Sequence, residues 1–223
     1  MQKYKRTEPP SQAAFPIAKE GLPFIGVAAF ATAVFALLGI AVMALFGLLA
    51  TLFICYFFRD PDRVIPDVAD GIVSPADGKV IKVENLNSSR FTDGRCRKIS
   101  IFMSIFNVHV NRIPFDGRVL QIDYFPGKFF SANLDKASRD NEHNAVYLET
   151  ETGQRLCVVQ IAGLVARRII CKIQKGDAVT RGHRFGLICF GSRLDVYLPE
   201  GVSITVKTGE MVKAGTSLLG KMS

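Results

Sequence analysis

Residues 175–182 read Lys-Gly-Asp-Ala-Val-Thr-Arg-Gly, and residues 208–215 read Thr-Gly-Glu-Met-Val-Lys-Ala-Gly. The two stretches start 33 positions apart and share one pattern: glycine, an acidic residue, any residue, valine, two further residues and a second glycine. Glycine suits the positive φ angles of tight turns, and an isolated valine between polar residues suits burial. The pattern predicts either a repeated structural unit or two hairpin turns that resemble each other by chance.

Short apolar runs surround this repeat from residue 60 to the end of the chain. Each run is rich in β-branched or aromatic residues and is bounded by Gly, Pro, Asp or Asn, which is typical of strands and turns. The predicted strands are residues 79–84, 98–104, 118–124, 145–150, 155–161, 168–173, 187–190, 194–198 and 202–206. Residues 129–140 indicate a short helix or a loop instead. The regular spacing of the strands predicts an all-β sandwich or barrel.

The paired turns resemble those of lipoyl- and biotinyl-type domains. The fold class predicted for residues 59–223 is therefore mainly β and barrel-sandwich-hybrid-like. Domains of that type carry a modifiable lysine on an exposed hairpin tip, and no lysine in that setting stands between the two stretches. The resemblance therefore implies a fold rather than a carrier function.

The N-terminal part of the chain has a different pattern. Residues 21–58 form a run of 38 without one charged residue, preceded by a basic tail over residues 1–20. One helix of that length would measure about 57 Å, whereas the hydrocarbon core of a bilayer is about 30 Å thick. We therefore expect an apolar helical membrane hairpin or two short spans, bent at Gly39 or Gly47. A single tilted span and the buried core helix of a soluble protein are the alternatives.

Charge and composition narrow the possible functions. The chain of 223 residues carries 28 Lys and Arg against 20 Asp and Glu, a formal charge of +8. Such an excess attracts nucleic acid or an anionic membrane. The basic residues are scattered and no ribonucleoprotein-type aromatic motif is present, so we expect no nucleic-acid partner. The five cysteines include no Cys-x-x-Cys pair. This pattern argues against both a disulfide framework and a metal site.

The stretch Phe190-Gly191-Ser192-Arg193 stands between two predicted strands. It resembles the self-cleavage site of the short bacterial phosphatidylserine decarboxylases. The resemblance continues, in the order of that family, through residues 56–61, 74–80, 103–104, 107–112 and 124–144. Because it covers nearly the whole chain, it is far more specific than a Gly-Ser pair, which is usually only a turn.

The resemblance implies an enzyme that cuts its own chain. Ser192 Oγ would attack the carbonyl of Gly191 to form an ester, and β-elimination would separate a β chain, residues 1–191, from an α chain, residues 192–223. Ser192 would end as an N-terminal pyruvoyl group, a covalent cofactor that binds the substrate amine and accepts electrons as carbon dioxide leaves. The family's reaction converts phosphatidylserine, a membrane phospholipid, to phosphatidylethanolamine. The two chains would stay together as a heterodimer, which could form a higher oligomer.

The resemblance also implies catalytic residues. His109 matches the family's catalytic histidine segment, and Asp77 would orient His109 or assist Ser192. Without the family, His109 would be a hydrogen-bonded strand histidine and Asp77 a turn residue. Arg112 stands where longer members carry a second histidine, and a guanidinium cannot act as a base. Either His109 serves both self-cleavage and decarboxylation, or another group such as His183 supplies one role.

Several basic residues are candidates for the lipid phosphate, because guanidinium and ammonium groups bind phosphate well. These candidates are Arg193, Arg112, Lys128 and Lys136. Residues 124–130, which combine aromatic residues with a lysine, predict either a loop that dips toward lipid or ordinary core packing. His143 is expected to be a solvated loop side chain.

Basic residues on both sides of the apolar run predict that both flanks lie in the cytoplasm. They are Lys3, Lys5, Arg6 and Lys19 before the run and Arg59 and Arg63 after it. Together with the family, this predicts a bacterial inner-membrane protein whose catalytic domain is cytoplasmic. The alternatives are a non-enzymatic membrane adaptor with a barrel-sandwich domain and a decarboxylase of a related phosphoserine lipid.

Overall fold

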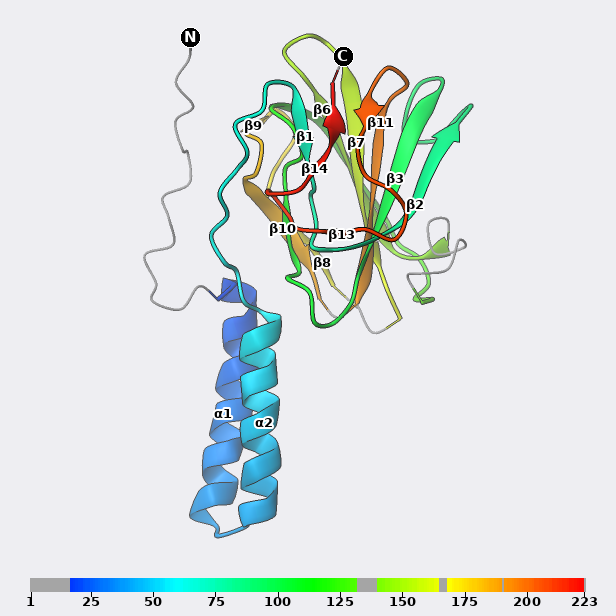
Figure 1. Ribbon diagram of the computed structural model, residues 1–223. Helices are drawn as coiled ribbons and strands as arrows, with labels where there is room; N and C mark the ends of the chain where they lie inside the picture. The colour runs from blue at the N-terminus through cyan, green and yellow to red at the C-terminus, as the bar shows by residue number, and fades with distance from the viewer. Residues whose placement is uncertain (1–16, 132–139, 165–167, 190, 223) are drawn as a thin grey trace. The chain divides into compact units, whose positions relative to one another are not determined.

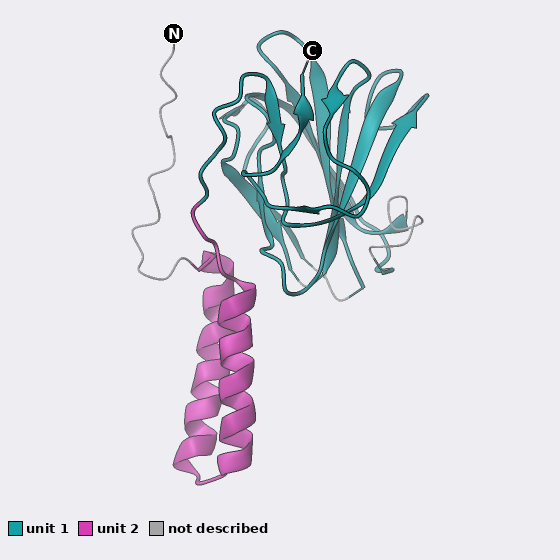
Figure 2. Cartoon of the chain, viewed as in Figure 1, with its two compact units in different colours: residues 1–8, 63–223 teal, residues 9–62 magenta. Residues whose placement is uncertain are grey.

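The computed structural model describes residues 17–131, 140–164, 168–189 and 191–222 (Figure 1). The chain divides into two compact units (Figure 2). The described residues 17–62 form a helical unit, and all strands of the described residues belong to the unit that contains residues 63–223. The change from helix to strand follows the change in sequence pattern near residue 60.

The helical unit is a pair of helices that pack against each other (Figure 1). A short 3-10 turn, η1 (Lys19–Gly21), leads into α1 (Leu22–Leu37), and α2 (Ala41–Phe57) returns alongside it. The chain reverses at Gly39, whose φ of 70° favours glycine. Gly47 lies inside α2, where an added Cβ would come within 2.6 Å of Thr32 Oγ1. The predicted bend at Gly39 is therefore confirmed. The predicted bend at Gly47 is not observed; this glycine instead allows α1 and α2 to approach each other closely.

The helices leave most of their large apolar side chains exposed. No residue of α1 is buried, and only Phe57 is buried in α2. The helical segment Lys19–Leu37 is long and apolar enough to cross a membrane by length and composition, and Ala41–Phe57 is a shorter apolar helix. A core helix of a soluble protein would bury at least one apolar face. The alternative of a buried core helix is therefore wrong.

The β unit confirms the mainly β prediction, and its strands are all antiparallel. They are β1 (Gly71–Val73), β2 (Gly78–Leu86), β3 (Cys96–Met103), β4 (Val110–Arg112), β5 (Gly117–Phe125), β6 (His143–Glu149), β7 (Arg155–Ala162), β8 (Ile169–Cys171), β9 (Ala178–Val179), β10 (Arg184–Ile188), β11 (Ser192–Pro199), β12 (Ser203–Ile204), β13 (Met211–Val212) and β14 (Leu218–Lys221). The largest sheet has eight strands in the order β13-β2-β3-β11-β7-β6-β5-β9. Two three-stranded sheets, β4-β10-β8 and β1-β14-β12, complete the unit.

Each predicted strand overlaps an observed one, whereas β1, β4, β9, β13 and β14 were not predicted. These five have two to four residues each and depend on pairing with distant strands. So short a run has no periodicity of its own, which explains why the sequence does not reveal it. The predicted helix or loop at 129–140 is described only up to residue 131 and at 140, so most of it lies outside the described residues.

Strand β11 lies between β3 and β7 and is buried on both faces (Figure 1). Successive side chains of a strand point to opposite faces. Leu194 and Val196 belong to the main core between the sheets, which also includes Ile101 of β3 and Phe185 of β10. Tyr197 belongs to a second apolar cluster on the outer face. Ser192 therefore points inward, and the residue that follows it points outward.

The repeated stretches adopt the same backbone features. Their four glycines have φ angles of 94° and 84° in the first copy and 100° and 72° in the second. Val179 and Val212 are both buried, as predicted. The two copies form β9 and β13, which lie at opposite edges of the eight-stranded sheet. Equivalent places in one sheet favour a repeated structural unit over chance similarity.

We predict that Gly182→Ala destabilises the protein more than Gly153→Ala does. Both glycines have positive φ, 84° and 79°, but a Cβ at Gly182 would overlap the Ile65 side chain and a Cβ at Gly153 would meet nothing within 4 Å. The overlap should add about 1–3 kcal/mol to the loss of unfolding free energy. Urea unfolding of the two variants measures this difference, and equal losses would contradict the close packing of Ile65 on the first turn.

Candidate functional site

Ser192 is the first residue of β11 and is fully buried. Its backbone pairs with Met103 at the end of β3 and with Ala162 at the end of β7. Its Oγ donates to Met103 Sδ at 3.4 Å. Gly191, just before it, has a φ of 69°, and an added Cβ there would meet nothing within 4 Å. The left-handed backbone, rather than crowding, is therefore what favours glycine at this position.

Both ends of the loop that carries His109 contact residues at or near Ser192. Residues 104–109 start after Met103, which pairs with Ser192, and end where the carbonyl of His109 accepts a hydrogen bond from the Ile188 N–H at 3.4 Å. Ile188 is four residues before Ser192. The topology therefore brings His109 and the Gly191–Ser192 bond to one end of β11.

The His109 ring is held in one orientation. Its Nδ1 lies 2.9 Å from the carbonyl oxygen of Asn107, and the side chain is 2% exposed. The Asn107 Oδ1 accepts from both the backbone N–H and the hydroxyl of Ser104, at 2.8 Å each. Because a carbonyl oxygen can only accept, Nδ1 carries a proton, and in the neutral ring Nε2 has the lone pair. A histidine in this tautomer can act as a base through Nε2.

Three buried side-chain amides lead to Ser192, and the sequence analysis did not single them out as functional residues. Asn144 Nδ2 donates to Gln160 Oε1 at 3.1 Å, and Gln160 Nε2 donates to Asn111 Oδ1 at 2.8 Å. Asn111 Nδ2 then donates to Met103 Sδ at 3.8 Å, the sulfur that also accepts from Ser192 Oγ. Two good donors thus share one weak acceptor, which a polar or anionic oxygen would replace favourably.

Asp77 lies at the same end of the eight-stranded sheet as Ser192. It precedes β2, and β2 is separated from β11 only by β3. Its Oδ1 accepts from the backbone N–H of Ala214 at 2.7 Å, and its Oδ2 pairs with Arg63 at 2.8 Å. The carboxylate therefore binds the second copy of the repeated turn.

Arg112 is buried beside the first copy of the turn. Its guanidinium donates to the carbonyl of Gly182 at 2.7 Å, and its backbone N–H donates to the carbonyl of Pro75 at 2.9 Å. The Arg112 side chain also lies close to Gly215, at 3.0 Å from the position of an added Cβ. Arg112 thus contacts both copies of the repeated turn, at Gly182 and at Gly215.

The other predicted lipid contacts are in different surroundings. Arg193 is fully buried, and Lys128 is exposed with its Nζ 5.9 Å from the centroid of the Phe130 ring. Lys136 lies outside the described residues. In the aromatic stretch 124–130, Tyr124 is exposed. The partly buried rings pack instead: Phe125 stacks on His143, and Phe129 packs against Ala162 and Ile188.

The expectation that His143 is a solvated loop residue is wrong. His143 starts β6 and is 2% exposed, with Nδ1 at 2.6 Å from the carbonyl oxygen of Asn141. Its Nε2 lies 3.1 Å from the Arg90 guanidinium, which can only donate, so the ring is neutral. Burial is the main cause that lowers the pKa of His143. His183, the reserve candidate for the base, is half-buried and directly follows the first repeated turn.

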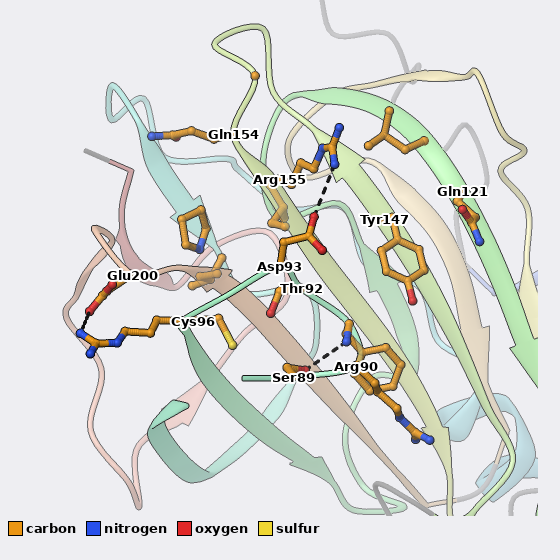
Figure 3. A pocket seen from close by; sticks show the side chains of 17 residues that line it. Ser89, Arg90, Thr92, Asp93, Cys96, Gln121, Tyr147, Gln154, Arg155 and Glu200 are labelled. Atoms are coloured by element: carbon orange, nitrogen blue, oxygen red, sulfur yellow. Dashed lines mark hydrogen bonds and ion pairs between the residues drawn. The ribbon is translucent and has the colours of Figure 1, made fainter. Parts of the chain in front are cut away.

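A cleft of about 530 Å³ lies at the opposite end of β11 (Figure 3). Its lining includes Pro199, seven residues from Ser192, which is about 23 Å along an extended strand. Two of its arginines are paired with acidic neighbours: Arg155 with Asp93 at 3.6 Å and Arg95 with Glu200 at 3.4 Å (Figure 3). The cleft is therefore separate from the site around Ser192.

Comparison with known proteins gives a consistent result. The family model described as "Phosphatidylserine decarboxylase" matches residues 50–220. A protein of Desulfotalea psychrophila is 47% identical over 93% of this chain and 97% of its own length. Proteins of Geotalea uraniireducens and Syntrophus aciditrophicus are 51% and 52% identical, each over 92% of this chain and 96% of their own length. All three relatives are named "Phosphatidylserine decarboxylase proenzyme".

We predict that Gln160→Leu lowers the free energy of unfolding by about 1–3 kcal/mol, because it leaves the buried Asn111 Oδ1 and Asn144 Nδ2 without their partner. Gln121→Leu, at an exposed position of β5, is the matched control and should change the free energy by less than about 0.5 kcal/mol. Urea unfolding checks both values. Equal effects of the two substitutions would show that the amide chain does not support the fold.

Proposed function

The chain belongs to the phosphatidylserine decarboxylase family, and we propose that it is a self-processing carboxy-lyase that converts phosphatidylserine to phosphatidylethanolamine. One observation carries this proposal: Gly191, with its left-handed backbone, and the buried Ser192 stand at the start of β11, beside the loop that holds His109. This arrangement supports a reaction between a hydroxyl group and the peptide bond that precedes it.

In the proposed self-cleavage, Ser192 Oγ forms a bond to the carbonyl carbon of Gly191 and its proton passes to His109 Nε2. The bond from Gly191 to the Ser192 nitrogen then breaks, the nitrogen takes the proton, and an ester remains. Loss of the Ser192 Cα proton expels the Gly191 carboxylate and leaves a dehydroalanine. Addition of water and release of ammonia give the pyruvoyl group at residue 192.

The surroundings of Ser192 fit the pyruvoyl group. The serine itself is the precursor, and the buried Asn111 amide beside it offers a donor for a ketone or carboxylate oxygen. Once formed, the group supplies an electron sink for loss of carbon dioxide. The chain's own residues bind the serine head group, exclude water around Ser192 and deliver a proton to the carbon that loses carbon dioxide.

We propose His109 for the proton transfers of both reactions. Its Nδ1 hydrogen bond to Asn107 leaves Nε2 as the basic atom, and its burial keeps the ring in place. Arg112 stays protonated and is bonded to the Gly182 carbonyl, so we assign it a structural role. We propose that Asp77 is a supporting residue, which holds Arg63 and the second repeated turn near the site.

The two products are proposed to remain a heterodimer. Residues 192–199 pair with β3 on one side and with β7 on the other. In addition, β13 pairs with β2, and β14 pairs with β1. Strands from both sides of the cut therefore share the same sheets, which supports association without a covalent link. The repeated turns at the sheet edges support a barrel-sandwich-like classification of the unit.

We also propose that the helical hairpin anchors the protein in the bacterial inner membrane, with the β unit in the cytoplasm. Five residues separate the end of α2 from residue 63, so the tether is short. Exposed apolar residues stand within three positions of the ends of both strands that flank β11: Ile105 and Phe106 after β3, and Leu164 after β7. We propose that these three residues contact the bilayer and that Lys128 approaches lipid phosphate; Lys128 is exposed, and its carbonyl accepts from Glu142 N–H next to the end of β7.

We predict that the purified wild-type chain appears by intact mass as two fragments, residues 1–191 and 192–223, the smaller one with a ketone at its N-terminus. Ser192→Ala removes the attacking hydroxyl and should leave one uncut chain without decarboxylase activity. Ser203→Ala, at an exposed position of β12, is the control and should be cut normally. An uncut wild-type chain that releases carbon dioxide from phosphatidylserine would contradict the proposal, and an uncut, inactive one would favour the adaptor function.

For the base, we predict that His109→Ala slows self-cleavage by about 10²- to 10⁴-fold, whereas His183→Ala leaves the rate unchanged. The measurement is a time course of fragment formation after synthesis of each variant. Normal cleavage of His109→Ala would assign the proton transfer to another group. Carbon dioxide release from phosphatidylserine, compared with release from an ether-linked phosphoserine lipid, separates the proposed substrate from a related one.

A further inference from the structure

Arg193 follows Ser192 directly and is fully buried on the outer face of β11. Its Nε donates to Asp195 Oδ1 at 2.6 Å, and one terminal nitrogen donates to Asp195 Oδ2 at 3.2 Å. The same terminal nitrogen donates to Ser100 Oγ on β3 at 2.8 Å. The guanidinium therefore donates to both carboxylate oxygens of Asp195 on its own strand, and also to Ser100 on the neighbouring strand.

The charges around Arg193 alternate in sign. Asp195 Oδ2 lies 3.4 Å from Lys98 Nζ, and Lys98 Nζ lies 3.9 Å from Glu84 Oε2. Arg193 and Asp195 are 0% exposed, and Lys98 is 8% exposed. The ring of Tyr197 lies beside Lys98 Nζ, 5.7 Å from it to the centroid. The buried members of this series are fixed strongly, because loss of one partner would leave a buried charge uncompensated.

The side-chain direction of Arg193 separates it from the substrate side of the sheet. Ser192 points to the inner face, where its Oγ contacts Met103, and the next residue must point to the outer face. A phosphate ligand would have to displace Asp195 and Ser100 from a guanidinium that is fully buried. These contacts favour a role inside the protein over the lipid contact considered from the sequence.

We propose that Arg193 is a positioning residue: its bond to Asp195 and Ser100 fixes residue 192 at the end of β11, both before self-cleavage and after it. The inference rests on the proposed function. Cleavage would turn residue 192 into a chain end, and chain ends lose order unless they are held. Since a displacement of about 1 Å at a reacting group can cost about 100-fold in rate, such an anchor would matter for both reactions.

Arg193→Lys tests the proposal, because lysine keeps the charge but lacks the planar fork that binds Asp195 with two bonds. We expect self-cleavage to slow at least ten-fold. In the processed fraction, kcat should fall while the KM for phosphatidylserine vesicles stays within two-fold, because Arg193 does not touch the lipid. A raised KM with unchanged kcat would instead make Arg193 a lipid ligand and would overturn the proposal.

A double substitution separates positioning from stability. Arg193→Met with Asp195→Leu replaces the buried ion pair with apolar side chains, a change that often preserves stability, and Lys98 keeps Glu84 as its partner. We expect a thermal unfolding midpoint near that of the wild type but cleavage at least ten-fold slower. The matched control is Gln121→Met with Asp123→Leu, which removes an exposed pair with the same spacing on β5 and should be cut at the wild-type rate.

The outcomes distinguish failure of the proposed function from failure of the positioning role of Arg193. If the wild-type chain is not cut between residues 191 and 192, the proposed function fails. If the wild type is cut and either folded variant is cut at the same rate, the positioning role of Arg193 fails. Failure of both variants to fold would also overturn it, since the network would then serve the fold as a whole.

Discussion

Hydrogen bonding along both edges of β11 is the constraint on which the site depends. The strand pairs with β3 from Ser192 to Pro199 and with β7 from Ser192 to Tyr197, without a register shift. A slip by one residue would break both ladders and turn each side chain to the opposite face. Only the observed register points Ser192 toward Met103 and the inner amides. The same register points Arg193 toward the outer ion network.

The end of β11 is unusual in carrying polar groups on both buried faces. On the inner face, Asn144, Gln160 and Asn111 form a chain of side-chain hydrogen bonds. On the outer face, Arg193 and Asp195 pair in full burial. A buried polar group without a hydrogen-bond partner is costly in a medium of low polarity. On each face, neighbouring strands supply partners for these groups. The inner chain ends on the weak thioether acceptor of Met103, which leaves binding capacity beside Ser192.

Local sequence patterns were sufficient to predict the long strands and to recognise the family. Strand β7 could be predicted because an apolar run between turn residues is visible without any partner. Gln160 in that run could not be recognised as a site residue, since its partner Asn111 is 49 positions away and meets it only when the sheets pack. Arg193 suggested a phosphate ligand because guanidinium groups bind phosphate well, a reason that takes no account of burial. Asp195 two positions later was the available signal, since residues with that spacing share one face of a strand.

The C-terminal strands are distributed through the β unit rather than gathered in one hairpin. Strand β11 is central in the largest sheet, β13 forms an edge of the same sheet, and β14 pairs with the early strand β1. Contacts so distant in sequence form only when nearly the whole unit has assembled. Under the proposed function, the bond between residues 191 and 192 would be placed for reaction only at that stage. Activation would then act as a proofreading step of biosynthesis, since chains that misfold would never acquire the reactive ketone.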